Sequence, residues 1–255
     1  MEMTTEQQLD QHLKSLHLGT FRKLYREQAE EARRESLSYE GYLLGLTERE
    51  REVRRRNRIA RLLRESKLPL EKHLDVFDCK RLPNKVAAHL DILLEGSFVD
   101  RKENVLAFGN PGSGKSHLLC AIGQELIHRD RRVLFSPCSL LVQELLIAKR
   151  ELALPKYLKS LSKYDVLIID DIGYVQQSRE EMEVLFVLIA DCYEKTSLMI
   201  TSNLPFSKWE AIFKDPMTTA AAIDRLVHHS IILELNLPSY RLEESKRGKE
   251  VNKET

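Results

Sequence analysis

The stretch NVLAFGNPGSGKSH, residues 104–117, decides the fold that this sequence predicts. It opens with the apolar run NVLAF, which is typical of a buried strand, and the glycines behind that run mark a loop. The residues that follow, HLLCAIGQELIHR (117–129), repeat apolar side chains at helical spacing. A strand, a glycine-rich loop and a helix in this order indicate the start of a strand–helix–strand unit.

Four further apolar runs predict strands, and helical stretches separate them. The runs are RVLFS (132–136), DVLIID (165–170), SLMITS (197–202) and IILEL (231–235). The stretches between them are SLLVQELLIAKREL, EEMEVLFVLIADCYE and the region 206–228. Because the strands are apolar almost throughout, both faces of their sheet should be covered, as in parallel sheets. The predicted fold class is α/β with a five-stranded parallel core.

The first 67 residues predict a separate, small all-α domain. Thr4 and Thr5 can cap a first helix that Gly19 can end, FRKLYREQAEEARRES gives a second helix, and a third begins near residue 38. The predicted domains are a helical DNA-binding or oligomerisation domain (1–67), a linker (68–84), the α/β domain (85–242) and a disordered tail (243–255).

Composition limits the class of protein. The formal net charge of the 255 residues is only +1, so any affinity for nucleic acid must come from local clusters of charge. The four cysteines form no C-x-x-C pair, which argues against a disulfide scaffold and against a zinc site. The N-terminus is polar and no apolar run approaches the ~20 residues of a membrane helix, so we expect a cytoplasmic protein without membrane contact.

Residues 109–116, GNPGSGKS, match the full phosphate-loop pattern G-x-x-x-x-G-K-[ST]. Glycines let the backbone wrap a phosphate group, and the N–H groups at the helix start supply positive potential. Lys115 can reach the β- and γ-phosphates of a nucleotide, and Ser116 can ligate Mg²⁺. A glycine-rich turn that binds nothing is the alternative. The predicted nucleotide-binding residues are Gly109, Asn110, Pro111, Gly112, Ser113, Gly114, Lys115, Ser116 and His117.

Two carboxylates follow the buried run VLII (166–169). Asp170 and Asp171 stand at the C-terminal end of this strand, where open α/β sheets bind their ligands. Asp170 is suited to the Mg²⁺ shell and Asp171 to orienting an attacking water. Two aspartates that only cap a helix are the alternative.

The order of the strands along the chain adds a third position. A whole strand–helix unit separates the phosphate loop from the DVLIID strand, which is typical of nucleotide hydrolases with a further strand inserted between these two. The inserted strand would be SLMITS, and Asn203 at its end would then face the γ-phosphate. Asn-Leu-Pro also favours a turn, so a turn residue is the alternative.

Four segments together resemble the IstB/DnaC branch of the AAA+ ATPases, and within it the IstB-like transposition helper ATPases. They are GNPGSGKSH (109–117), LIIDDIGY (167–174), ITSNLPF (200–206) and AAIDRLVHHS (221–230), and the resemblance covers roughly 75–240. It implies an ATP- and Mg²⁺-dependent ATPase whose subunits assemble side by side. It also implies that Arg225 completes the active site of a neighbouring subunit. A salt bridge on a helix surface is the alternative for Arg225.

Two departures from the family pattern bear on activity. Asp171 stands where many AAA+ enzymes have Glu, and its shorter reach would slow hydrolysis or make it depend on a partner. About 20 residues follow the last predicted strand, too few for a helical lid, so Arg241 is only a weak candidate for a second sensor. His228 and His229 are not expected to bind metal, because neighbours on a helix point about 100° apart.

Residues 49–67 hold nine Arg or Lys and three acids. On a helical wheel the arginines share one face, which predicts sequence-independent contacts with DNA phosphates, and Val53, Ile59, Ala60 and Leu63 lie roughly opposite. Ion pairs at i,i+4 spacing with the glutamates of 48–52 are the alternative. The predicted DNA-binding residues are Arg51, Arg54, Arg55, Arg58 and Arg61, and the weaker candidates are Lys149, Arg150, Lys156 and Lys159, with Tyr157 among them.

These residues predict an ATP-dependent DNA-binding ATPase that oligomerises on duplex DNA and delivers it to a transposase. A replicative helicase loader of the DnaC type shares the whole core and is the first alternative. The loader type with an N-terminal zinc cluster is excluded, because residues 1–78 contain no cysteine. A nucleotide-gated DNA clamp with little hydrolysis is the second alternative, and a small-molecule kinase is more distant.

Overall fold

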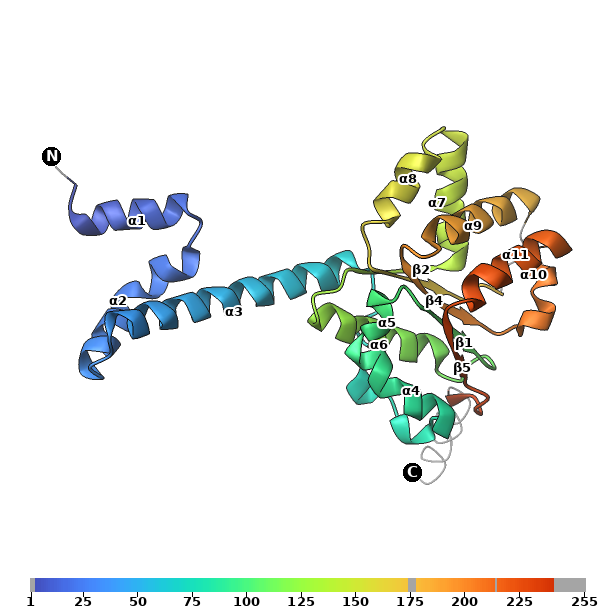
Figure 1. Cartoon of the computed structure of the whole chain (residues 1–255), viewed down its shortest axis with the longest axis horizontal. Coiled ribbons are helices and arrows are strands. Elements are labelled where there is room, and N and C mark those ends of the chain that lie inside the picture. Colours follow the sequence, from blue (N-terminus) through green and yellow to red (C-terminus); the bar gives the residue numbers. More distant parts are fainter. Residues whose placement is uncertain (1–2, 174–177, 214, 241–255) are drawn as a thin grey trace, which may run out of the picture. The chain divides into compact units, whose positions relative to one another are not determined.

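The computed structural model describes residues 3–173, 178–213 and 215–240 (Figure 1). The chain divides into two compact units, Met1–Arg61 and Leu62–Thr255. The predictions for Arg241 and for the tail 243–255 fall outside the described residues, as does the end of the predicted domain 85–242. Within the described residues, no helix combines the length and apolarity that crossing a lipid bilayer requires.

The first unit is helical. Helix α1 spans Thr5–Ser15, α2 spans Gly19–Arg34, and α3 spans Tyr39–Glu65 and continues into the second unit. Thr4 caps α1 as predicted, because its side chain accepts a hydrogen bond from the N–H of Gln7 in a capping box. The prediction that Gly19 ends α1 is wrong: His17 makes the turn at a φ of +55°, and Gly19 opens α2.

The second unit contains a five-stranded parallel sheet with the order β2-β3-β4-β1-β5. Its strands are β1 (Asn104–Phe108), β2 (Val133–Pro137), β3 (Val166–Asp170), β4 (Ser197–Ser202) and β5 (Ser230–Glu234). The predicted fold class is confirmed. Strand β4 lies between β1 and β3 and pairs with both, as the strand order along the chain predicted.

Helices cover both faces of the sheet (Figure 1). Figure 1 shows α4 (Asn84–Glu95), α5 (Ser97–Asp100) and α6 (Lys115–His128) on one side. The other side carries α7 (Cys138–Arg150), α8 (Leu154–Leu161), α9 (Arg179–Cys192), α10 (Glu210–Phe213) and α11 (Pro216–Val227). Three short 3₁₀ turns complete the regular structure of the described residues, at Leu74–Val76, Cys79–Arg81 and Phe206–Lys208.

Helix α8 was not among the predicted helices. Leu152 adopts a left-handed φ of +56°, which ends α7, and Pro155 stands in the first turn of the next helix. Proline is favoured there because its fixed φ suits a helix start and its missing N–H is not needed. The chain therefore turns back between β2 and β3 with two helices instead of one.

Candidate functional site

The phosphate loop connects β1 to α6, and its conformation depends on its glycines. A Cβ on Gly109 would lie 2.2 Å from the carbonyl oxygen of Leu235, so the loop runs against the chain that leaves β5. Gly114 has a φ of +94° and is the N-cap of α6. The loop thus ends with the free N–H groups of the first turn of α6, which are suited to bind an anion.

The side chain of Lys115 binds the backbone of this loop. Its Nζ donates hydrogen bonds to the carbonyl oxygens of Gly109 (2.8 Å) and Asn110 (2.9 Å). Burial lowers the pKa of Lys115, and the nearby carboxylates of Asp171 and Asp170 act in the opposite direction. The ammonium is therefore held close to both the loop and the acidic pair.

Ser113 supplies a direct test of whether an anion fits the loop. Its side-chain oxygen is buried and has no hydrogen-bond partner within the described residues. Buried hydroxyls are almost always paired, so an orphaned one inside a phosphate loop fits a missing ligand oxygen. The residues present here fit a bound phosphate.

The acidic pair lies at the carboxyl edge of the sheet, beside the phosphate loop. Asp170 ends β3, and Asp171 follows it with a left-handed φ of +66°. Burial raises the pKa of Asp171, the charge of Asp170 raises it further, and Lys115 lowers it. A carboxylate beside a second carboxylate and a lysine is suited to accept a proton or to hold a water.

Thr201 joins the two aspartates, and sequence reasoning missed its role. Its hydroxyl donates a 2.7 Å hydrogen bond to Oδ1 of Asp170 and accepts one of 2.7 Å from the backbone N–H of Asp171. The segment ITSN could have indicated this role, because a threonine near the end of the inserted strand must lie beside the end of the neighbouring strand β3, where the aspartates stand. The partner atoms became evident only with the strand register.

Asn203 follows β4 at the same edge of the sheet, where it was predicted. Its Oδ1 is buried and, among the described residues, has no hydrogen-bond partner. A Cβ added at Gly173 would come within 2.6 Å of this oxygen, so the amide packs against the segment that follows the acidic pair. The structure thus brings Lys115, Asp170, Asp171 and Asn203 to one edge.

A second group of residues encloses the other end of the loop, and of its aromatic members only His117 was predicted to bind the nucleotide. A cavity of about 310 Å³ is lined by Phe77, Arg81, His117 and Tyr240 together with residues 112–116. The backbone N–H of Tyr240 donates to the carbonyl oxygen of Gly112 (3.0 Å), and the guanidinium of Arg81 lies 5.3 Å from the centre of the Tyr240 ring. Aromatic and guanidinium planes beside a phosphate site are suited to a nucleobase.

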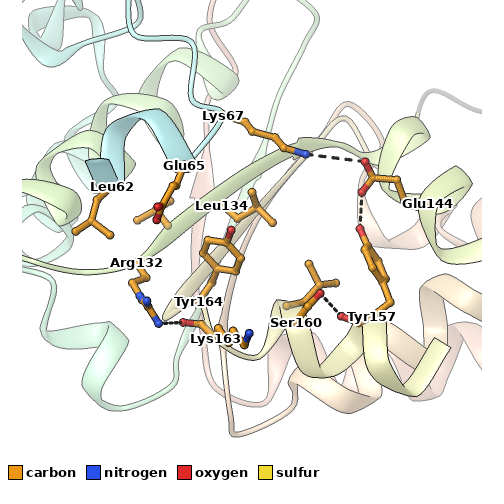
Figure 2. A pocket seen from close by; sticks show the side chains of 12 residues that line it. Leu62, Glu65, Lys67, Arg132, Leu134, Glu144, Tyr157, Ser160, Lys163 and Tyr164 are labelled. Carbon is orange, nitrogen blue, oxygen red and sulfur yellow. Dashed lines mark hydrogen bonds and ion pairs between the residues drawn. The ribbon is translucent and has the colours of Figure 1, made fainter. Parts of the chain in front are cut away.

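A further cavity, of about 520 Å³, lies beside the edge strand β2 (Figure 2). Lys67 and Glu144 form an ion pair of 3.9 Å at its rim, and Arg132 Nη1 donates to the carbonyl oxygen of Lys163 at 3.5 Å. No residue of the phosphate loop lines it, so it is not the nucleotide site.

Arg225 lies on α11, on the opposite side of the sheet from α6. Its Nη1 donates to the carbonyl oxygen of Ala221 (2.9 Å), and its guanidinium carbon lies 5.2 Å from the centre of the Phe186 ring. These contacts are with α11 and α9 and do not bring Arg225 to the phosphate loop of its own chain. Within the described residues, its guanidinium contacts a carbonyl oxygen and an aromatic ring, and no carboxylate pairs with it there.

The basic stretch of α3 is partly engaged in ion pairs. Arg54 pairs with Glu50 (2.6 Å) and donates to the carbonyl oxygen of His17 (2.8 Å), while Arg56 lies 4.0 Å from Glu52. The i,i+4 alternative therefore applies to Arg54 and Arg56, and Arg55, Arg58 and Arg61 also make interactions within the protein. Of the side chains predicted to lie opposite the arginines, Val53, Ile59 and Leu63 are half-buried and Ala60 is exposed. The other predicted DNA-binding residues, Arg51, Arg55, Arg58 and Arg61, are all exposed.

Two of the weaker DNA candidates also have acidic partners. Lys149 on α7 pairs with Glu183 on α9 (2.9 Å), and Arg150 lies 3.9 Å from Glu180. Tyr157 donates to Glu144. On α8, Lys156 is exposed, as is Lys159.

Known proteins resemble this chain over nearly its whole length. The family described as IstB-like ATP binding protein matches residues 11–248. An insertion-sequence ATP-binding protein of Sinorhizobium fredii is 42% identical over 238 residues, which cover 93% of this chain and 80% of that protein. An ATP-binding protein of insertion sequence IS5376 from Geobacillus stearothermophilus is 37% identical, and the match covers 98% of this chain and 99% of that protein.

Solved structures share the fold at low sequence identity. DnaI superposes with a TM-score of 0.55 at 20% identity, over 66% of this chain and 94% of that chain. The replication initiator DnaA, bound to AMPPCP and single-stranded DNA, gives a TM-score of 0.54 at 19% identity. The match covers 73% of this chain and 57% of the DnaA chain. The DnaC helicase loader gives a TM-score of 0.52 at 18% identity, and the match covers 59% of this chain and 88% of the DnaC chain. These likenesses support the shared α/β fold alone.

Proposed function

Because the chain belongs to the IstB-like ATP-binding protein family, we propose that it is an AAA+ ATPase that assembles on duplex DNA and delivers that DNA to a transposase. The observation that carries the proposal is the convergence of Lys115, Asp170 and Asp171 beside a phosphate loop with the orphaned hydroxyl of Ser113. Such a site can bind and cleave a nucleoside triphosphate.

ATP is the nucleotide that the family name specifies, and residues 109–117 would hold its phosphates. Phe77, Arg81 and Tyr240 line the space for the base. Ser116 and Asp170 would hold Mg²⁺, which neutralises charge on the phosphates when bound. Thr201 fixes the carboxylate of Asp170 from behind.

Asp171 would orient the attacking water and accept its proton. Its pKa is raised by burial and by Asp170, which makes it a better proton acceptor than an ordinary aspartate, and the nearby ammonium of Lys115 favours its ionised form. Asn203, whose Oδ1 has no partner among the described residues, stands at the same edge to help place that water. Lys115 releases the carbonyl oxygens of the loop when phosphate oxygens replace them.

A neighbouring subunit would complete the site. Arg225 packs on Phe186 of α9 and makes its contacts with α9 and α11, which suits an arginine that reaches the γ-phosphate bound by the next copy of the chain. ATP would then bridge two subunits, so its binding shifts the equilibrium toward the assembled state. Hydrolysis would loosen the assembly.

DNA contacts would come from the exposed arginines of α3, chiefly Arg51, Arg55, Arg58 and Arg61. Contacts of this kind to phosphates carry no sequence information and weaken with salt. They suit a protein that must hold many different target sequences. The DNA-bound oligomer would present this target to the transposase.

Fluorescence anisotropy of labelled duplex and single-stranded DNA, with ATP, with ADP and without nucleotide, tests the proposal. We expect tight binding only to duplex and only with ATP, and no ATP effect in a Lys115→Ala variant. A preference for single strands would support the helicase loader instead. Absence of DNA binding in every nucleotide state would refute a DNA-directed function.

Transposase delivery and hydrolysis need separate readouts. Transposase should be retained on immobilised duplex DNA only when the wild-type chain and ATP are both present. Phosphate release measured with and without DNA separates an ATPase from a clamp. A background rate in every condition would favour the clamp.

A further inference from the structure

Three potential metal ligands meet at the end of the molecule's second unit where α9 and α11 both end. Glu194, His228 and His229 are exposed, and one ligand atom from each lies within 4.8 Å of the other two. The expectation that the two histidines diverge along a helix is wrong. Helix α11 ends at Val227, and the histidines lie in the turn behind it with ring centres 4.2 Å apart.

The surrounding contacts hold this group of three residues in place. The backbone carbonyl oxygen of His229 accepts a 2.7 Å hydrogen bond from the N–H of Asn104 at the start of β1. The Tyr193 hydroxyl and Nδ1 of His228 form a 3.1 Å hydrogen bond, which leaves Nε2 of that ring for another partner. Glu194 has a left-handed φ of +57° in the turn after α9.

The donor set is that of a transition-metal ion. Two imidazoles and one carboxylate with an open fourth position form a common zinc site, with bonds of about 2.0–2.2 Å. Such bonds place tetrahedral donors roughly 3.3 Å apart, so rotations of exposed side chains suffice to close the present spacing. We propose that Glu194, His228 and His229 form a binding site for a divalent metal ion of the zinc class.

Charged side chains of both signs surround this corner. Glu103 lies near His229 and is paired with Arg101 at 2.8 Å. Asp224 and Arg225 lie near the Tyr193 hydroxyl, which forms a hydrogen bond with His228. Affinity for a cation would therefore come from the three ligands themselves.

The site would join two elements that the proposed catalytic arginine depends on. Arg225 stands three and four residues before the histidines and packs on Phe186 of α9, while Glu194 lies just behind α9. An ion shared by Glu194 and the histidines therefore ties the end of α11 to the end of α9. This consequence rests on the proposed function, whereas metal binding itself does not.

Titration of the nucleotide-free, untagged full chain with Zn²⁺ by calorimetry tests the site, and Co²⁺ absorption reports the coordination geometry. We expect one ion per chain and tetrahedral Co²⁺ bands. A His228→Ala/His229→Ala double variant should bind at least about tenfold more weakly, as should Glu194→Gln. A His12→Ala/His89→Ala double variant removes two histidines elsewhere, one exposed and one half-buried, and should bind as the wild type does.

The outcomes are distinct from those of the function assays, because Zn²⁺ affinity is measured without nucleotide or DNA. Equal Zn²⁺ affinity in the His228→Ala/His229→Ala variant, or no binding by the wild type at about 100-fold molar excess of ion, would overturn the site. Circular dichroism of each variant shows that it is folded. Glu194→Gln keeps the shape of the side chain, so it tests the ligand even where the double variant unfolds.

Discussion

The hydroxyl of Thr201 donates to Oδ1 of Asp170 and accepts from the N–H of Asp171, both at 2.7 Å. One side chain from the inserted strand thereby fixes both members of the acidic pair. Because Thr201 is almost fully buried, water cannot replace it. Its position makes it a positioning residue for the proposed hydrolysis.

We predict that Thr201→Val reduces ATP hydrolysis by about 10–100-fold, the effect typical of removing the support behind a metal ligand. The half-buried N–H of Asp171 also loses its acceptor, which costs on the order of 1 kcal/mol of folding stability. Thr201→Ser keeps the hydroxyl and should retain most activity. Phosphate release and thermal unfolding of both variants are the measurements, and a Val variant as active as the Ser variant contradicts this role.

Asp171 gives a prediction about pH. Its pKa is raised in the folded state above the ordinary 3.8, chiefly by burial. The protonated form of Asp171 therefore contributes its full stabilisation at a pH below the pKa of the unfolded state. This stabilisation is lost as the pH rises through the pKa of the folded state. The ionised side chain lowers stability, so Asp171→Asn should raise the melting temperature at a pH where Asp171 is ionised, and this gain should shrink toward acid pH.

The same Asp171→Asn variant should reduce hydrolysis by on the order of 100-fold, since it removes the proposed proton acceptor. Nucleotide binding should persist. In the wild type, the acidic limb of the rate–pH profile should lie above the 3.8 of an ordinary aspartate. A variant that is both less stable and fully active would refute the assignment.

Arg225→Ala should bind ATP normally and reduce hydrolysis by roughly 1,000-fold or more, as expected for an arginine that stabilises a transferring phosphoryl group. Mixing Arg225→Ala with Lys115→Ala subunits provides the sharper measurement. In the mixture, an Arg225→Ala subunit can bind ATP with its own intact Lys115. A neighbouring Lys115→Ala subunit can then supply an intact Arg225 to that site, so activity should reappear. Two inactive proteins that stay inactive when mixed would speak against completion by a neighbour.

The arginines of α3 divide into two groups with different expected effects. Arg51→Gln or Arg55→Gln should weaken duplex binding and lower the slope of log affinity against log salt by about one for each phosphate that the arginine neutralises. Arg54→Gln should instead lower thermal stability, because Arg54 pairs with Glu50 and caps the carbonyl of His17. Anisotropy in a salt series and thermal unfolding separate the two. Identical salt slopes in all variants would exclude α3 from the DNA interface.

Local patterns were sufficient for much of the fold. Each strand is an apolar run, and the helices between them have helical spacing, so both follow from short-range sequence. The place of β4 between β1 and β3 was also accessible, because the order of the motifs along the chain indicates the type of sheet. Helix α8 was missed because Leu152 adopts a left-handed φ that residues other than glycine rarely take.

The site was predicted where a motif is contiguous and missed where it is assembled from distant segments. Lys115, Asp170 and Asp171 lie in recognisable stretches. The partners of Thr201 depend on strand register, and the cavity that contains Phe77 and Tyr240 joins segments far apart in the chain. The two histidines of the proposed metal site were judged by helical geometry, whereas α11 ends at the residue before them.

The sequence by itself determined the phosphate loop, the acidic pair and the α/β class, because each depends on residues adjacent in the chain. Only the tertiary structure decided which groups meet: Thr201 with both aspartates, Arg54 with His17, and Glu194 with the two histidines. The physical reason is that hydrogen bonds and metal coordination act over about 2–3 Å. Such close approach between distant segments exists only after folding fixes their positions.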